Sequence, residues 1–320
     1  MVEYKTNNFL INEEVNKYLE SIIKSKLFAN GYIFYGAEEV GKKQTALNFI
    51  KEIFKQYDSS GNIEEKIYNN NHPDFLVIEP TSFLKGKAIK NTASEIPKKN
   101  NADVIKIDQI RNIKTFLSQR SIESEKKIVL ISDAHLLNEA ASNCLLKTLE
   151  EPSNGIFILL TSQINLLLDT IKSRCQMIRF KSFTKKQIEK FLQNNLDKSE
   201  LIISKNFTLQ DLIQSANGSP GEIINQIDIW NQLSDEIQGK LDFPLNNILE
   251  IFKVSKLISE QLEIYQQISL IQLIQQMWWV KTRNSKIITK LEKLKIHIKS
   301  HIQPRLAWEV TFLKIKMEDL

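Results

Sequence analysis

The sequence is poor in the residues that build covalent or metal-bound frameworks, with two cysteines and four histidines in 320 residues. Cys144 and Cys175 cannot form a disulfide framework or a four-thiolate zinc site, and the histidines show no spacing that would complete a mixed site. We therefore expect no zinc and a reducing, cytoplasmic location. The uninterrupted apolar stretches are far shorter than the roughly 18–20 residues of a membrane span, so we expect no membrane contact.

Glycine and proline are also scarce, at 9 and 7 residues, which argues against an all-β protein and favours a helix-rich chain. Charged residues make up 25% of the chain, which excludes wholesale disorder. The net charge of +5 permits contact with nucleic acid. It does not favour a DNA-binding module acting alone, because the basic residues are not interleaved with aromatic side chains that stack on bases.

Strand-like and helix-like segments alternate in the first half of the chain. Five apolar runs predict strands at residues 32–35, 74–79, 127–132, 155–162 and 176–180. Helical patterns follow Gly41, begin near Asp108 and run from 138 to 152. The alternation predicts an α/β domain whose parallel sheet is covered by helices on both faces. We expect the polar stretches 58–71 and 82–101 to be loops.

Beyond Phe180 the sequence is almost entirely helical, with breaks at residues 217–221 and 239–244. We expect three domains, an α/β domain (1–180), a small helical domain (181–239) and a second helical domain (240–320). The segment 266–280 has no charged residue and is apolar on more than one helical face, so it should be buried on more than one side. It predicts either a domain core or a subunit interface.

Gly36, Gly41 and Lys42 have the G-x-x-x-x-G-K spacing of a phosphate-binding loop, at a point where a strand leads into a helix. Backbone N–H groups there would hold phosphate oxygens, with Lys42 on the β- and γ-phosphates. The next position is Lys43, and an ammonium cannot ligate Mg²⁺ as a Ser or Thr hydroxyl does. Two interpretations remain open, a degenerate site that binds ATP or ADP weakly and a loop that binds nothing.

The predicted strand at 127–132 leads to Asp133, where P-loop enzymes place a second contact to Mg²⁺. In many such enzymes the following residue is a glutamate that activates the attacking water, but here it is Ala134, which has no proton-accepting atom. We interpret His135 as a surface or capping residue. With defects at both Lys43 and Ala134, we expect no ATP hydrolysis by the chain on its own and no required cofactor.

Arg174 stands just before the last predicted strand. A lone arginine is normally a solvated surface charge or the partner of a carboxylate in its own domain. At the edge of a nucleotide-binding domain it could instead reach the γ-phosphate of a neighbouring subunit as an arginine finger. Spacing alone does not separate these interpretations.

Several segments together resemble the AAA+ subunits of bacterial DNA polymerase III clamp loaders. They are NCLLKTLEEP (143–152), LDTIKSRCQ (168–176), HPD (72–74), IDQIR (107–111) and GSPG (218–221). The departures at Lys43 and Ala134 make the chain look most like the delta-prime subunits of that family, which commonly lose part of their ATP site. Gly221 and Glu222 occupy the place of the second sensor, so no cation is supplied there. The four-cysteine zinc module of many relatives is absent, since 58–71 contains no cysteine.

The resemblance implies an AAA+ (P-loop NTPase-like) domain followed by a helical lid and a helical collar. It implies a non-catalytic subunit of the polymerase III holoenzyme, a DNA-directed DNA polymerase assembly. The partners would be clamp-loader ATPase subunits and a delta subunit in a hetero-pentameric ring, with the sliding clamp and primed DNA bound through the complex. Arg174 would be the finger that this subunit presents to its neighbour's ATP. The alternative is an ATP-hydrolysing motor subunit or a related AAA+ ATPase that tolerates Lys43 and Ala134.

Overall fold

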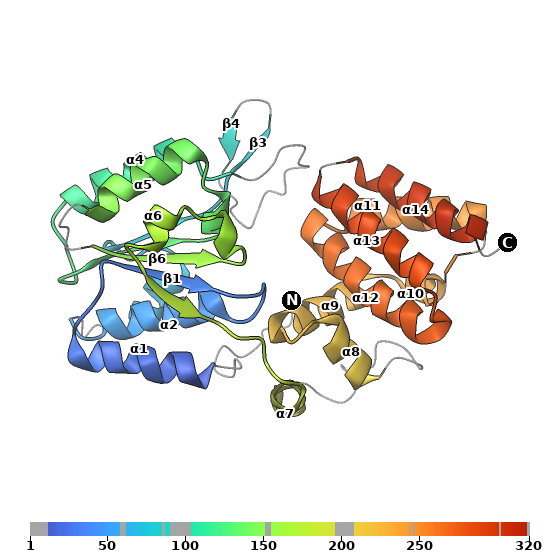
Figure 1. The fold of residues 1–320 in the computed structure, drawn as a ribbon, viewed down its shortest axis with the longest axis horizontal. Helices are drawn as coiled ribbons and strands as arrows, with labels where there is room; N and C mark the ends of the chain where they lie inside the picture. Colours follow the sequence, from blue (N-terminus) through green and yellow to red (C-terminus); the bar gives the residue numbers. More distant parts are fainter. Residues whose placement is uncertain are drawn as a thin grey trace. The chain divides into compact units, whose positions relative to one another are not determined.

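The structure of the chain is a computed structural model. It describes residues 12–57, 62–84, 87–89, 104–150, 155–195, 208–242, 244–245, 247–300 and 302–318. The chain forms two compact units, Met1–Ser182 and Phe183–Leu320 (Figure 1). The three domains expected from the sequence stay a prediction.

The first unit is built on a five-stranded parallel sheet, and all five predicted strands are confirmed. The strand order is β2 (Phe75–Ile78), β5 (Lys127–Ile131), β6 (Gly155–Thr161), β1 (Gly31–Tyr35) and β7 (Gln176–Arg179). Because the strands are parallel, their carboxyl ends share one edge of the sheet and their amino ends share the opposite edge. The residues that follow each strand therefore meet at the carboxyl edge, and those that precede each strand meet at the amino edge.

Helices cover both faces of this sheet, as the continuous apolar strands require. Alternate residues of β5 enter different apolar clusters, Ile128 and Leu130 on one face, Val129 and Ile131 on the other. The first face is covered by α1 (Glu13–Ser25), α2 (Lys42–Phe54) and α3 (Ile63–Tyr68). The second is covered by α4 (Ile107–Ser118), α5 (Glu139–Glu150) and α6 (Asp169–Lys172) (Figure 1).

Two segments that we expected to be loops contain regular structure. Helix α3 lies within 58–71, and its buried Ile63 and Ile67 are four residues apart, a two-residue pattern easily missed in a polar stretch. Within 82–101 the strands β3 (Ser82–Leu84) and β4 (Lys87–Ile89) form an antiparallel pair. The loop prediction was wrong at these places. Residues 85–86 and 90–101 of the same stretch lie outside the described residues.

The second unit is helical, as predicted. Its helices are α7 (Lys185–Asn195), α8 (Leu209–Ser215), α9 (Pro220–Gln232), α10 (Asp235–Leu241), α11 (Ile248–Gln261), α12 (Ile264–Thr282), α13 (Ser285–Lys299) and α14 (Pro304–Glu318). The break expected at 217–221 is formed by Asn217 and Gly218, with φ of 48° and 79°, before Pro220 opens α9. The second break starts later than expected, because Gly239 lies inside α10.

Helix α12 is the centre of the second unit and contacts α8, α9 and α13. Its fully buried apolar residues are Leu270, Ile271, Leu273, Ile274, Met277 and Trp278. The Trp278 indole N–H donates to the carbonyl of Leu241 at 2.8 Å, and that of Trp308 donates to Gln267 Oε1 at 2.9 Å. Of the two interpretations of 266–280, the structure therefore favours a domain core. Because α12 packs on helices from both sides of residue 239, the boundary expected there stays a prediction.

Candidate functional site

The predicted phosphate-binding loop lies between β1 and α2. At each of its two glycine positions the backbone geometry favours a residue without a side chain. The backbone of Gly36 has a φ of 154°, and a Cβ there would lie 2.3 Å from the carbonyl oxygen of Phe180. Its N–H donates to the carbonyl of Thr161 at 3.3 Å. Gly41 is left-handed (φ 85°, ψ 18°) and stands at the start of α2. The sequence pattern thus corresponds to a loop of defined shape.

The loop lysine is bonded to its own loop. Lys42 Nζ donates to the carbonyl of Gly36 at 2.9 Å and also to that of Ala37. Burial lowers the pKa of Lys42, and the nearby carboxylates of Glu38 and Glu39 oppose this shift. Burial also raises the pKa of Glu39, against the attraction of Lys42. A phosphate that entered this loop would have to replace the two carbonyl contacts of Lys42.

Lys43 stands where a Mg²⁺-binding hydroxyl would be. Its ammonium pairs with Glu79 Oε1 at 3.0 Å, and both side chains are exposed. Glu79 follows β2, so the carboxyl edge of the sheet supplies the partner. The pair satisfies Lys43 without any phosphate or metal ion.

Asp133 follows β5 and has a left-handed backbone (φ 47°, ψ 49°). Burial raises the pKa of its carboxyl group, although the charge of His135 opposes the shift. Burial also lowers the pKa of His135, whose Nδ1 lies 3.3 Å from Thr161 Oγ1. Ala134 is fully buried in the apolar cluster of the sheet's second face. The methyl side chain of Ala134 cannot accept a proton from water.

The sheet order brings these residues together at the carboxyl edge. Strand β6 lies between β1 and β5, so Thr161 at its end stands between the P-loop and Asp133. Its buried hydroxyl accepts the N–H of Gln163 at 3.0 Å. Thr161 was not among the site residues expected from the sequence. The one sequence feature that could have indicated Thr161 is a hydroxyl-bearing residue at the end of a predicted buried strand.

Arg174 lies at the opposite, amino edge of the sheet. The register pairs Tyr32 with Gln176 and Tyr35 with Arg179, so Arg174 precedes the start of β7 while the P-loop follows the end of β1. The five residues of β1 separate these edges by roughly 16 Å. Arg174 therefore cannot complete the P-loop of its own chain.

The guanidinium of Arg174 is held within its own unit. Nη2 lies 2.5 Å from Glu150 Oε1, and Nη1 donates to the carbonyl of Thr170 at 3.0 Å. Its side chain is 37% exposed and that of Glu150 is 53% exposed. The guanidinium can thus exchange this partner for another anion at the surface.

Cys175, the next residue, is packed rather than reactive. A Cβ on Gly31 would lie 2.6 Å from Cys175 Sγ, so the thiol occupies the space above that glycine. Burial raises the pKa of Cys175 to about 12, which keeps it protonated at neutral pH.

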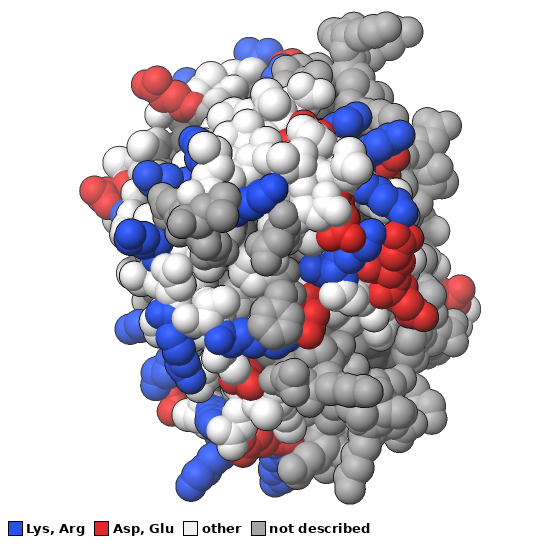
Figure 2. All heavy atoms as spheres, turned by 90° about the vertical axis from the view of Figure 1, so that its right-hand side faces the viewer, with Lys and Arg blue, Asp and Glu red and all other residues white. Residues whose placement is uncertain are grey.

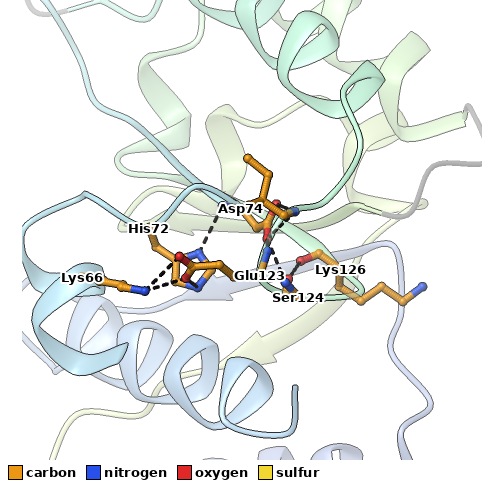
Figure 3. Close-up of polar contacts among 7 residues, drawn as sticks. Lys66, His72, Asp74, Glu123, Ser124 and Lys126 are labelled. Atoms are coloured by element: carbon orange, nitrogen blue, oxygen red, sulfur yellow. Dashed lines mark hydrogen bonds and ion pairs between the residues drawn. The ribbon is translucent and has the colours of Figure 1, made fainter. Parts of the chain in front are cut away.

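The His-Pro-Asp segment is part of a structural network at the amino edge (Figure 3). The buried Asp74 carboxylate accepts three consecutive backbone N–H groups at 2.7–3.1 Å, those of Ile122, Glu123 and Ser124. Nδ1 of the buried His72 accepts the N–H of Asp74 at 3.1 Å. Lys66 pairs with Glu123 at 2.8 Å. The segment fixes the loop before β5 against the start of β2.

Glu222, at the expected place of the second sensor, is engaged inside the second unit. Its Oε1 accepts the hydroxyl of Ser269 at 2.5 Å and the amide of Gln226 at 3.2 Å. The position carries a carboxylate directed to α12, so it supplies no cation.

In the described part of the chain, no three His, Cys, Asp or Glu side chains gather in a way that could hold a metal ion. Among the described helices, none is both long and apolar enough to cross a bilayer.

A parallel sheet of this order, with a P-loop after β1 and an acidic residue after β5, defines a P-loop NTPase-like domain of the AAA+ class. The chain is similar in fold to the solved structure of a DNA polymerase III gamma subunit-related protein from Thermotoga maritima. The TM-score is 0.55 at 16% identity, and the match covers 94% of this chain and 99% of that one. The predicted fold class is confirmed.

The chain belongs to the family described as "DNA polymerase III, delta subunit", whose model matches residues 11–184. A model of the cyanobacterial DNA polymerase III delta prime C-terminal domain matches 186–315. The DNA polymerase III subunit delta' of Bacillus subtilis is 32% identical over 195 residues, 59% of this chain and 53% of that protein. The subunit delta' of Pseudomonas aeruginosa is 32% identical over 154 residues, which are 46% of this chain and 42% of that protein. The matches thus span about half the length of these relatives, and the resemblance found in the sequence is confirmed.

Proposed function

We propose that this chain is a non-catalytic clamp-loader subunit that supplies Arg174 to the ATP site of a neighbouring subunit. Its partners would be ATPase subunits and a delta subunit in a five-membered ring, with the sliding clamp and primed DNA bound through the complex. The observation that carries the proposal is the location of Arg174 at the edge of the sheet opposite its own P-loop. From that edge a guanidinium can reach only an ATP held by another chain.

The geometry of the P-loop supports the non-catalytic part of the proposal. Lys42 is bonded to loop carbonyls, Lys43 is paired with Glu79, and the position of the water-activating acid is a buried alanine. Each feature weakens a different contribution to phosphoryl transfer, namely phosphate binding, Mg²⁺ coordination and proton removal. Weak ATP or ADP binding is compatible with this arrangement, and we expect no turnover.

The second candidate is an ATP-hydrolysing motor subunit. It is favoured by similarity to the DNA polymerase III subunit tau of Bacillus subtilis, 28% identical over 228 residues, 70% of this chain and 37% of that protein. The pairing of Lys43 with Glu79 argues against it, because a motor needs a Mg²⁺ ligand at that position.

ATP turnover separates the two candidates. We expect the purified chain to show no Mg²⁺-dependent turnover above background, and a complex assembled with ATPase subunits to show turnover that this chain stimulates. Turnover of roughly 1 s⁻¹ by the chain alone, abolished by Lys42→Ala, would establish the motor instead. Nucleotide binding without turnover is consistent with the proposal.

A further inference from the structure

The net positive charge of the chain is concentrated near its end. Residues 281–316 contain ten Lys and Arg against two Asp and Glu, a net of +8, so the other 284 residues carry a net charge of −3. This segment contains α13 and α14 up to Lys316; with the acids Glu318 and Asp319 that follow, residues 281–320 carry a net charge of +6. A charge asymmetry of this size along a sequence indicates contact with a polyanion.

The lysines of α13 are arranged in a row. Lys286, Lys290 and Lys293 are spaced i, i+4, i+7, which places them on one side of the helix. Lys286 and Lys293 are exposed and Lys290 is half-buried, and the opposite side is buried through Ile287, Leu291, Leu294 and Ile298. The ammonium of Lys290 donates to the backbone carbonyl of Lys314, so α14 adds its exposed Lys314 to the row. We call these four lysines the α13 strip.

Few acidic groups neutralise the strip. Glu292, the single acid of α13, is engaged by Gln275 Nε2 at 3.0 Å and lies 3.9 Å from Lys295 Nζ. Among the residues that the structure describes, Lys286 and Lys293 form no ion pair. Figure 2 views the side on which α10, α11 and α14 lie at the right of Figure 1, and Lys and Arg side chains run down its left-hand part.

We propose that the α13 strip binds the phosphate backbone of duplex DNA. The seven residues from Lys286 to Lys293 span about 10 Å of helix, along which a duplex presents several phosphates. Protein interfaces are instead enriched in aromatic residues and Arg and depleted in Lys, and α13 contains no Trp, Tyr, Phe or Arg. The same lack of aromatic residues argues against a single strand, whose bases would need stacking partners.

The salt dependence of binding gives the strip a quantitative test. Four phosphate contacts predict a slope of log K against log salt of roughly −3.6, so affinity for a 20-base-pair duplex should fall roughly 150-fold between 50 and 200 mM salt. The triple variant Lys286→Gln/Lys290→Gln/Lys293→Gln leaves about one phosphate contact. Its affinity for the duplex should therefore fall only roughly 3- to 4-fold over the same salt range. Fluorescence anisotropy with the full-length chain measures both, and circular dichroism verifies the fold of each variant.

The matched control is Lys185→Gln/Lys186→Gln/Lys190→Gln, which removes the same charge from exposed lysines of α7 in the same unit. We expect the control to retain most of the affinity and the steep salt dependence of the unmodified chain. Equal losses in the two variants would reduce the effect to net charge and overturn the proposal. Tighter binding of a ten-residue oligoglutamate peptide than of the duplex would also overturn it, in favour of an acidic protein partner. Because the test uses the chain alone, either result leaves the clamp-loader function unaffected.

Discussion

Arg174 and Glu150 form one ion pair, and substituting each partner in turn separates the two roles open to the arginine. Arg174→Ala and Glu150→Ala both remove the contact between Nη2 and Oε1, but only Arg174→Ala removes the guanidinium. If Arg174 only stabilises its own unit, both variants should lose some stability and keep normal turnover per assembled complex. If it acts on a neighbour's ATP, Glu150→Ala should keep the activity that Arg174→Ala loses.

The exposure of the pair limits the structural effect. Side chains that are 37% and 53% exposed form an ion pair worth about 0.2–1 kcal/mol. In a unit of about this size, 1 kcal/mol shifts the melting temperature by roughly 2–4 °C. By contrast, an arginine finger accelerates phosphoryl transfer by on the order of 10³–10⁵ at the site it serves. A finger can therefore be recognised against the small change in stability.

The assay is the ATPase of the complex assembled with its ATPase subunits, delta, the clamp and primed DNA, alongside melting temperature and assembly by gel filtration. We expect both variants to assemble and melt within about 4 °C of the unmodified chain. Arg174→Ala should lower stimulated turnover by the share of the one site it faces, while Glu150→Ala should not. Arg174→Lys should restore little, because an ammonium keeps the charge but loses the fork of donors. Normal turnover in an assembled Arg174→Ala complex, or equal losses in both variants, refutes the finger.

Three further predictions concern stability and thiol reactivity. Asp74→Asn should destabilise the chain by roughly 3 kcal/mol or more in urea denaturation, because an amide cannot accept all the N–H groups that the carboxylate holds, while the exposed Asp108→Asn should have little effect. Gly36→Ala should lower the melting temperature, because its Cβ would meet a backbone carbonyl at 2.3 Å; Gly239→Ala, with nothing within 4 Å, should raise stability by up to about 1 kcal/mol. Alkylation of Cys175, followed by peptide mass mapping, should be slow at both pH 7 and pH 8, because its raised pKa of about 12 leaves very little thiolate at either pH; rapid labelling at pH 7 would contradict the buried thiol.

The sheet and its two covered faces could be predicted because each strand is a continuous apolar run and a helix separates most neighbours. The prediction failed where an element is short. Helix α3 has two buried isoleucines and one turn and a half, too little for a helical period to stand out. The hairpin of β3 and β4 has three residues in each strand, which gives no usable alternation.

The sequence predicted the loop and the acidic residue of the candidate site. It did not predict which side chains form ion pairs there. Gly36, Gly41, Lys42 and Asp133 follow from local spacing at strand ends. Contacts between distant segments, such as that of Lys43 with Glu79 or Arg174 with Glu150, depend on strand order and side-chain reach, which local patterns do not encode. For the same reason the sequence could not place Thr161 between the P-loop and Asp133.

The P-loop pattern of this chain has structural reasons that do not depend on phosphate chemistry. Gly36 is required by the approach of the Phe180 carbonyl, and Gly41 by the left-handed turn into α2; neither requirement involves a nucleotide. Lys42 binds the carbonyls of its own loop and so contributes to the loop's shape without a phosphate. By contrast, Lys43 forms an ion pair with Glu79, and Ala134 packs in an apolar cluster. The carboxyl edge can therefore lose catalysis without losing its fold, while the amino edge keeps the Asp74 network and the exposed guanidinium of Arg174 on the same rigid sheet.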